Sequence, residues 1–332
     1  MRVLVCGGAG YIGSNMASVL TSAGYEPVVY DNLSTGHHLA VKDAEFVKGD
    51  LNDYQLLLKT LRDYRIQAVF HFAAFIEVGE SVQLPLKYYR NNLSNTQNLL
   101  WAMEQADVQI FIFSSSAAVY GILEKTPINE NAPKRPINPY GSTKLAVEQM
   151  CYYQSQTGRL RYAALRYFNA AGAGSDATLG EDHRPESHLI PLTIAAAMGK
   201  RRDIQIFGTD YPTPDGTCIR DYIHVDDLCT AHLLALEKLA GSNKNKSSEL
   251  IYNLGNGKGY SVKEVIETVR QISGKDFQVL PVQRRPGDPP VLTSDASKAK
   301  TELGWDIKFP KLEQIVESAW QWHNQHPKGY ED

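Results

Sequence analysis

The stretch RVLVCGGAGYIG, residues 2–13, decides the fold of this 332-residue chain. It joins a short apolar run to a glycine cluster, and residues 11–23 then have the pattern of a helix. Glycines between a strand and a helix permit a tight turn, let a pyrophosphate approach the backbone, and let the helix pack closely on the strand. The cluster fits both GxGxxG and GxxGxxG, which share Gly10 and Gly13. The segment therefore predicts a dinucleotide-binding strand–turn–helix unit.

A carboxylate stands where such a unit needs one. A second apolar run, residues 26–30, is followed by Asp31, 18 residues past Gly13. At that position the carboxylate accepts hydrogen bonds from the adenosine ribose hydroxyls. Asn32 and Leu33 follow, and neither could receive a 2′-phosphate, so NAD is favoured over NADP. After a third short strand at 45–48, residues 50 and 51 either meet the adenine or form a simple turn.

Strands and helices keep alternating through the first half of the chain. Near-continuous apolar strands that alternate with helices predict an α/β fold, a doubly wound parallel (Rossmann) sheet. We expect a NAD-binding Rossmann domain over 1–170, with some later segments returning to it, and a smaller C-terminal α/β lobe over 171–332 that mainly binds the substrate. The further strands are expected at 68–72, 109–113 and 161–166, and the helices at 56–63, about 85–105, 140–157, 226–239 and 261–272.

Composition excludes several classes of protein. Apolar residues make up 43% of the chain and charged residues 21%, values that rule out a disordered or coiled-coil chain. The net charge of −3 gives no sign of a nucleic-acid surface. The four cysteines lie far apart without a CxxC, so no disulfide framework or zinc knuckle is expected. We expect no metal, and we expect His323 and His326 to be surface residues. No secretory or membrane-spanning segment is recognisable, which favours a cytoplasmic protein.

A tyrosine and a lysine one helical turn apart predict the chemistry. Tyr140 and Lys144 are at i and i+4, hence on one helix face. The pKa of a free tyrosine is about 10, and a nearby ammonium together with a positive nicotinamide ring would lower it. Ser116 is the last of three serines that end a buried strand, 24 residues before Tyr140. Ligands bind at the carboxyl ends of parallel strands, so this trio indicates hydride chemistry at a carbinol carbon.

These motifs, taken in order over essentially the whole chain, resemble the UDP-glucose 4-epimerase family within the extended short-chain dehydrogenase/reductase superfamily. The matching segments include residues 7–13, 31–33, 71–73, 78–81, 88–92, 113–121, 140–144, 165–169, 206–216, 220–225, 252–255, 284–289, 295–298 and 304–305.

The resemblance implies a NAD-dependent, reversible epimerisation at C4 of UDP-glucose and UDP-galactose through a 4-keto intermediate, in a homodimer built through the helices at about 85–105 and 140–157. The catalytic residues would be Ser116, Tyr140 and Lys144, which also contact cofactor or sugar. The other cofactor-binding residues would be Gly7, Gly10, Tyr11, Ile12, Gly13, Asp31, Asn32, Leu33, Ser34, Thr35, Gly36, Asp50, Leu51, Phe72, Ala73, Ala74, Asn91 and Phe168. Those at the UDP-sugar would be Asn169, His188, Leu189, Gln205, Ile206, Phe207, Arg220, Arg285, Asp288 and Val291.

Two of these residues, both arginines, could instead have a purely structural role. The guanidinium groups of Arg220 and Arg285 suit a diphosphate, because arginine offers forked, charge-assisted donors. Each could instead pair with a neighbouring aspartate, Asp221 or Asp288. The chain also departs from the family pattern: Ile76 replaces a lysine found near the cofactor in some members, and His188 replaces an asparagine.

Alternative functions remain open on the same scaffold. Another UDP-sugar 4-epimerase would share every motif above. A nucleotide-sugar 4,6-dehydratase would need an acid and a base after the strand-end hydroxyl, where this chain has Ala117 and Ala118. A non-catalytic NAD-sensing protein would usually lack the tyrosine or the lysine. The small side chain of Val291, where strict relatives carry a tyrosine, suggests that UDP-GlcNAc and UDP-GalNAc are also accepted, unless Val291 is only a core residue.

Overall fold

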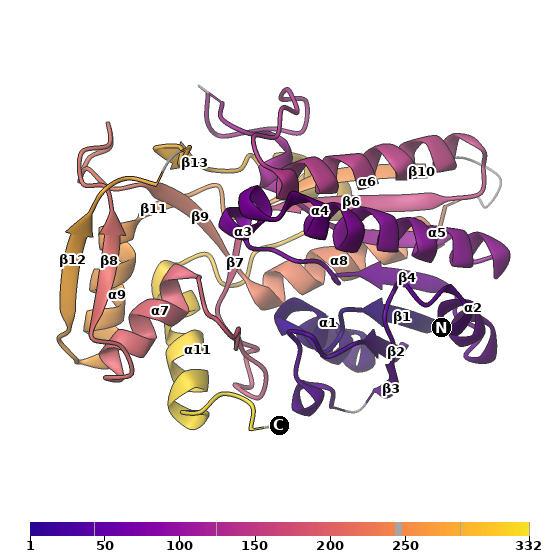
Figure 1. Cartoon of the computed structure of the whole chain (residues 1–332), viewed down its shortest axis with the longest axis horizontal. Helices are drawn as coiled ribbons and strands as arrows, with labels where there is room; N and C mark the ends of the chain where they lie inside the picture. Colours follow the sequence, from indigo (N-terminus) through magenta and orange to yellow (C-terminus); the bar gives the residue numbers. More distant parts are fainter. Residues whose placement is uncertain (43, 124, 243–247, 286, 332) are drawn as a thin grey trace.

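A parallel sheet of seven strands forms the centre of the larger unit in this computed structural model, which describes residues 1–42, 44–123, 125–242, 248–285 and 287–331 (Figure 1). The strand order is β10-β6-β5-β4-β1-β2-β3, and every neighbouring pair is parallel. The chain therefore reverses direction across the sheet between β1 and β4, which is where ligands bind in open α/β sheets. The strands are β1 (Arg2–Cys6), β2 (Glu26–Asp31), β3 (Glu45–Lys48), β4 (Ala68–His71), β5 (Ile110–Ser116), β6 (Arg161–Tyr167) and β10 (Ser248–Leu254).

Both faces of this sheet are apolar, because successive residues of each strand point to opposite faces and both sets are buried. In β1, Val3 and Val5 join the core on one face, whereas Leu4 and Cys6 join the core on the other. The first face is covered by α1 (Tyr11–Ser22), α8 (Val225–Ala240) and α10 (Ser297–Leu303). The second is covered by α2 (Tyr54–Asp63), α5 (Asn95–Gln105) and α6 (Pro139–Gln156). This is the predicted doubly wound Rossmann fold.

A smaller unit lies beside the carboxyl ends of these strands (Figure 1). Its strands are short and mostly paired with strands distant in sequence: β9 pairs with β7, β11 and β13, and β8 pairs with β12. The bounds are β7 (Asn169–Ala171), β8 (Asp203–Phe207), β9 (Ile219–His224), β11 (Gly259–Ser261), β12 (Gln278–Val282), β13 (Val291–Leu292), α7 (Leu189–Ala197), α9 (Val262–Ser273) and α11 (Leu312–Gln325).

The predicted helix at about 85–105 is wrong in one respect, because it is three elements. They are α4 (Pro85–Tyr88), the π-helix η2 (Tyr89–Ser94) and α5, and a further short helix, α3 (Val78–Gln83), precedes them. Pro85 opens α4, where a missing N–H costs nothing. In η2, the amide of Asn92 is hydrogen-bonded to the backbone of Phe75 through both its oxygen and its nitrogen. The short 3₁₀ elements η1 (His38–Ala40) and η3 (Ala117–Val119) complete the chain.

The helix expected at 261–272 is α9, and it begins with a capping box in which the Ser261 side chain and the Glu264 side chain each accept from the backbone nitrogen of the other residue. His323 and His326 are not surface residues: both are partly buried, and both rings lie against Trp322. Among the described residues, no helix has the length and apolar character needed to cross a bilayer.

Candidate active site

The glycine loop has no room for a side chain at Gly7 or at Gly13. A Cβ on Gly7, whose φ is +77°, would lie 2.5 Å from the nitrogen of Ala73, and one on Gly13 would lie 2.1 Å from the oxygen of Gly7. Such approaches force the backbone to move, so both residues must be glycine. At Gly10 the nearest atom to an added Cβ is 3.4 Å away, which leaves the space above the helix start open.

The start of α1 is built to receive an anion. Gly10 is its N-cap residue and no side chain caps the helix, so its first N–H groups are left for a ligand. The segment 34–36 lies against the loop, since a Cβ on Gly36 would be 2.7 Å from the carbonyl carbon of Ala9. The nitrogen of His37 also donates to the oxygen of Ala9. The pyrophosphate of a dinucleotide fits this cradle.

Asp31 is hydrogen-bonded to the same loop. Its carboxylate accepts from the nitrogen of Ala9 at 3.0 Å and from that of Leu33 at 2.8 Å. A carboxylate has about four lone-pair positions, so two of them stay available for ribose hydroxyls. Burial raises the pKa of Asp31, while these two backbone bonds act in the opposite direction. Beside it, the side chain of Asn32 donates to the carboxylate of Asp50 at 2.7 Å.

The remaining residues predicted to bind the cofactor also lie at the carboxyl ends of the strands. Residues 72–74 follow β4 directly, and Leu51 is buried in the turn after β3. Asn91 lies in η2, where its amide donates to Asn92 at 3.0 Å. Phe168 lies between β6 and β7. The positions predicted for NAD thus form one continuous edge of the sheet.

Ser116, Tyr140 and Lys144 meet beside that edge. Ser116 is the last residue of β5, and Tyr140 lies in the first turn of α6, which Asn138 caps by accepting from the nitrogen of Gly141. The ammonium of Lys144 donates to the backbone oxygen of Ser114 at 2.8 Å and lies 5.8 Å from the centre of the Tyr140 ring.

Burial controls how these groups titrate. It lowers the pKa of Lys144 to about 7. Burial raises the pKa of Tyr140, and a hydrogen bond with Ser116 acts in the opposite direction. The ammonium therefore needs a negative charge nearby to stay protonated, and the phenolate needs a positive one. Such a pair is arranged to exchange protons with a bound substrate.

A buried ion pair, which the sequence did not single out, fixes α6 against the sheet. The guanidinium of Arg166 in β6 binds both oxygens of Glu148, at 2.8 and 2.5 Å. Both side chains are almost fully buried, at 1% and 5% exposure. Ser115 donates to the same carboxylate at 2.5 Å. Glu148 is one turn beyond Lys144 and two beyond Tyr140, and this i, i+4, i+8 spacing was the signal available in the sequence.

The residues predicted to bind the sugar nucleotide lie in the smaller unit. Ile206 packs in the core beside Ile204, and the partly exposed Phe207 next to it faces the other side of the strand. In β13, Leu292 packs against the cluster of Ala117, Val119, Tyr120 and Ile128 that follows Ser116. Its neighbour Val291 is partly buried and faces the other side of the strand, and its place at the sugar stays a prediction.

Of the two arginines, Arg220 is paired with an aspartate, as the structural alternative foresaw, and Arg285 lies over an aromatic ring. The guanidinium of Arg220 is 2.5 Å from the carboxylate of Asp288 and not bound to Asp221, which accepts from the backbone of Asn256 and Ser294 instead. Arg285 lies 3.9 Å over the ring of Phe207. In β7, the amide of Asn169 donates to the oxygen of Asp221. His188 and Leu189 lie at the start of α7.

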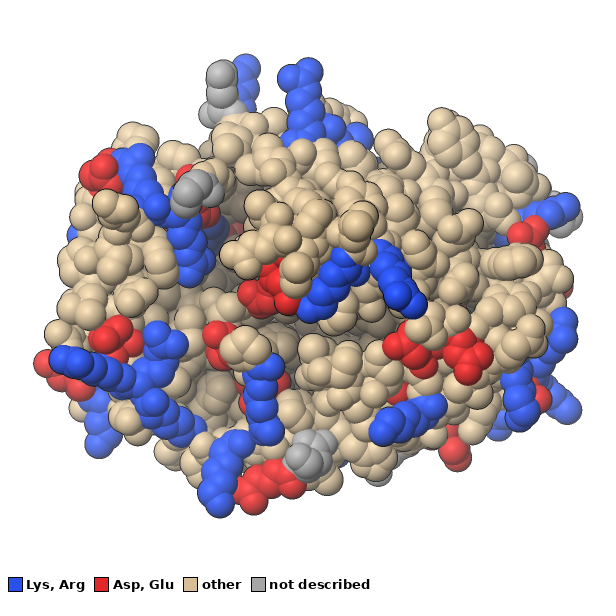
Figure 2. Space-filling view, viewed as in Figure 1, with Lys and Arg blue, Asp and Glu red and all other residues tan. Residues whose placement is uncertain are grey.

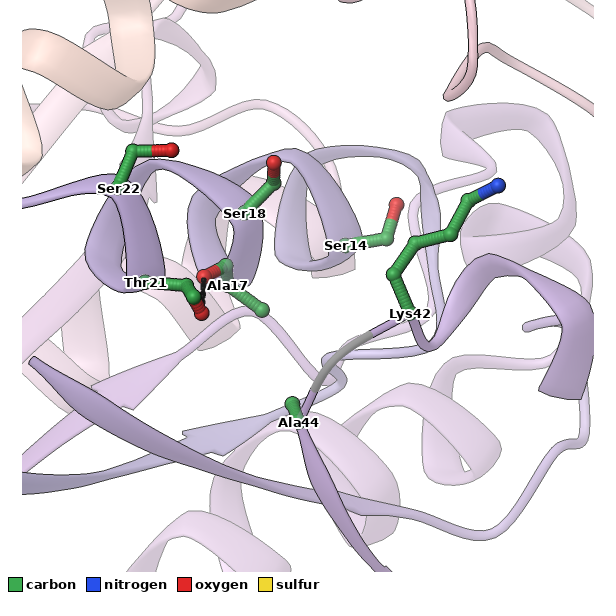
Figure 3. Close-up of a pocket in the computed structure, with 7 residues that line it drawn as sticks. All are labelled: Ser14, Ala17, Ser18, Thr21, Ser22, Lys42 and Ala44. Carbon is green, nitrogen blue, oxygen red and sulfur yellow. Dashed lines mark hydrogen bonds between the residues drawn. The ribbon is translucent and has the colours of Figure 1, made fainter.

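The surface around these groups is uneven. It is hollowed between the two units, and lysine and arginine side chains rim the hollow (Figure 2). A separate small pocket lies on the outer side of α1 and is unrelated to the predicted site (Figure 3). Its lining residues are Ser14, Ala17, Ser18, Thr21, Ser22, Lys42 and Ala44.

The fold and this site together define an extended short-chain dehydrogenase/reductase, in which a serine, a tyrosine and a lysine meet beside a dinucleotide cradle. Residues 3–255 match the NAD dependent epimerase/dehydratase family, and the chain belongs to it. The cofactor of this family is NAD, which the glycine loop, the uncapped helix and Asp31 fit.

The chain is also similar to individual epimerases over its whole length. The chain is 50% identical over 330 residues to a UDP-glucose 4-epimerase of Halalkalibacterium halodurans, covering 99% of this chain and 98% of that one. A crystal structure of UDP-glucose 4-epimerase from Brucella ovis in complex with NAD is 48% identical, with a TM-score of 0.93 over 97% and 98% of the two chains. The enzyme from Bifidobacterium longum, in complex with NAD⁺ and UDP, is 37% identical, with a TM-score of 0.93 over 99% and 100%.

Proposed function

We propose that the chain catalyses the NAD-dependent, reversible epimerisation of UDP-glucose and UDP-galactose at C4 of the sugar. The observation that carries this proposal is the group formed by the partly buried Ser116 and Tyr140 and the buried Lys144. The full-length likeness to UDP-glucose 4-epimerases supports the substrate. NAD, when bound, supplies an acceptor that reversibly takes the C4 hydrogen with its electron pair and leaves a 4-keto sugar.

The side chains divide the remaining work. Tyr140 accepts the proton of the 4-hydroxyl group, and Ser116 orients that hydroxyl through the hydrogen bond it makes with Tyr140. Lys144 stabilises the phenolate and contacts the nicotinamide ribose. Arg220 and Arg285 hold the diphosphate, while the sugar turns to present its other face. The ion pair between Arg220 and Asp288 keeps that guanidinium in place between turnovers.

The UDP-sugar site is proposed in the smaller unit. It would comprise Asn169, His188, Leu189, Gln205, Ile206, Phe207, Arg220, Arg285, Asp288 and Val291, with Ile206 contributing through its backbone. We assign the NAD site to the first 170 residues and to the later segments that return to the large sheet. The two units thus divide the binding of cofactor and substrate.

A homodimer is part of the same proposal. Exposed apolar side chains gather on α3, α4 and α6, where Val82, Leu86 and Tyr153 are 62%, 81% and 71% exposed. The surface over α5 and α6 carries few charged side chains (Figure 2). Apolar surface of this kind on neighbouring helices is typical of an interface between protein chains. We therefore propose that two copies meet through these helices.

Two measurements test the activity. Purified protein incubated with UDP-galactose should form UDP-glucose without added cofactor, and denaturation should release close to one NAD(H) per chain. Both follow because the reaction returns the cofactor to its starting state, so it has no need to leave. A purified protein without nucleotide that needs NADP for turnover would overturn the assignment, as would a 4-keto-6-deoxy product.

A further inference from the structure

Two histidines and two glutamates form a compact group in the segment between β7 and α7. Glu181, His183, Glu186 and His188 each bring one possible ligand atom, and these four atoms lie within 4.8 Å of one another. Glu181 is buried, His183 and Glu186 are partly buried, and His188 is exposed. The group lies beside the cofactor loop, since the ring of Tyr11 packs edge-on against that of His183, with 6.5 Å between ring centres.

The spacing of these atoms is that of ligands around a shared ion. Two ligand atoms about 2.1 Å from a tetrahedral metal are about 3.4 Å from each other. Nδ1 of His183 is 3.3 Å from the carboxylate of Glu181 and 3.6 Å from that of Glu186. Nδ1 of His188 is 3.5 Å from the other carboxylate oxygen of Glu186, Oε1, whereas His183 faces Oε2. Only the contact between His188 and Glu181, at 2.5 Å, is a short hydrogen bond, whose proton a cation would replace.

One nitrogen of the group faces two carboxylates without a well-aligned hydrogen bond. Nδ1 of His183 is buried and lies 3.3 and 3.6 Å from the carboxylates of Glu181 and Glu186, but within the described part of the chain it makes no hydrogen bond of ordinary geometry. A cation shared by this nitrogen and the two carboxylates would satisfy all three groups.

Neighbouring groups already fix the carboxylate of Glu186. One of its oxygens accepts from the backbone nitrogens of Ser187 and His188, at 2.7 and 2.8 Å, and the other faces His183. Ligands held in place by such outer contacts bind a metal without a large ordering cost.

We propose that Glu181, His183, Glu186 and His188 bind a divalent transition metal, Zn²⁺ in the first instance. Two imidazole nitrogens favour this class over Mg²⁺ and Ca²⁺, which take oxygen ligands. All four ligands come from one short segment, so the ion closes a small loop and the site has the features of a structural metal site.

The ion would hold one wall of the sugar-nucleotide site. His188 and Leu189 begin α7, and Ser187 between the ligands donates to Glu77 of the segment after β4, at 2.6 Å. A bound metal would therefore join the start of α7 to the cofactor side of the molecule. It would position this wall without contacting the reacting atoms.

The test uses the full chain as purified, with any affinity tag removed. We expect the protein to bind one Zn²⁺ per chain after treatment with a chelator, by isothermal titration calorimetry and by elemental analysis. Co²⁺ in the same site should give the intense visible bands of four-coordinate Co²⁺. The His183→Gln and Glu186→Gln variants should each bind at least 10-fold more weakly. The His38→Gln variant, which alters an exposed histidine outside the group, should bind as the wild type does.

Thermal unfolding gives a second readout that does not involve epimerisation. Zn²⁺ should raise the melting temperature of the wild type and of His38→Gln, and should leave that of His183→Gln unchanged. Less than half an equivalent of Zn²⁺ bound by the wild type, or unaltered binding by both Gln variants, would overturn the proposal. Loss of epimerase activity with Zn²⁺ binding intact would count against the proposed function alone.

Discussion

At the scale of single residues, the site depends on one hydroxyl group. The Tyr140→Phe variant keeps the ring and removes only the group that takes the proton. We expect kcat to fall by about 10²–10⁴-fold, because this is the usual contribution of general base catalysis. Binding of UDP, measured by calorimetry, should change little, since the arginines that hold the diphosphate are untouched. A variant with wild-type turnover would show that another group is the base.

Lys144 makes the second prediction, on pH dependence. The reaction needs the phenolate of Tyr140, so kcat should rise with pH through the pKa of that group. Burial raises this pKa, and a hydrogen bond with Ser116 acts in the opposite direction. A positive charge beside a phenol favours the phenolate, so we expect the ammonium of Lys144, 5.8 Å from the centre of the Tyr140 ring, to lower this pKa further. Lys144→Met removes the ammonium and leaves the effect of burial. The rise of kcat should therefore move to higher pH. Lys59→Met, an exposed lysine of α2, is the control and should leave the profile in place; a Lys144→Met profile at the wild-type pH would contradict the argument.

The breadth of substrates gives the third prediction. If Val291 faces the 2-substituent of the sugar, then Val291→Tyr should reduce kcat/KM for UDP-GalNAc by about one to two decades, because overpacking costs about 1–3 kcal/mol. Turnover of UDP-galactose, which has no acetamido group, should fall less. The matched Leu292→Tyr variant, at a side chain packed in the neighbouring apolar cluster, should leave the ratio of the two substrates unchanged. A wild type that rejects UDP-GalNAc, or a Val291→Tyr variant with unaltered turnover of it, would show that Val291 does not set the breadth of substrates.

Sequence alone could predict those residues whose environment is local. Asp31 and the glycines were identified because the strand, turn and helix around them are contiguous. The burial of the Ile206 side chain could not be predicted, because a strand pattern gives the alternation of faces but not which face meets a ligand. The group of Glu181 and His188 needed the folded segment to bring its four side chains together.

At the scale of elements, the buried pair of Arg166 and Glu148 joins α6 to β6. Arg166→Met should destabilise the protein by about 3–5 kcal/mol, because it leaves the carboxylate buried and unpaired. The double variant with Glu148→Gln should recover part of this loss, since neither charge then remains. Chemical unfolding of the two single variants and the double variant measures the coupling. Additive losses would mean that the two side chains do not interact.

Helices whose signals lie in their own sequence could be predicted, and those shaped by distant contacts could not. The strands and α6 follow from apolar runs and from a proline at the first helical position. The interval 78–105 could not be resolved from its periodicity. Its breaks depend on contacts with other segments, among them the bonds between Asn92 and Phe75. The π-helix that results carries Asn91, one of the proposed cofactor residues.

At the scale of the whole molecule, the fifth prediction concerns the apolar surface of the helices around α6. Leu86→Lys places a charge at the centre of the proposed interface, on a side chain that is 81% exposed in the single chain. We expect the wild type to be a dimer by light scattering and the variant to dissociate at least 10-fold more readily. Ile122→Lys, at an exposed apolar residue outside these helices, is the matched control. A wild type that is a monomer at micromolar concentration would refute the interface.

The position of β10 in the large sheet has a consequence for synthesis of the protein. This strand, residues 248–254, pairs with β6, and α8 and α10 cover the same part of the sheet. While the ribosome is still making the second half of the chain, the outer edge of β6 has no partner strand, and on one apolar face of the sheet only α1 is in place. Folding from the N-terminus, one domain after another, therefore cannot finish the first unit. The edge of β6 and part of the apolar face of the sheet therefore stay uncovered until about residue 303 has emerged. During that interval the nascent chain is most prone to pair with other chains, and we expect chaperones to bind it then.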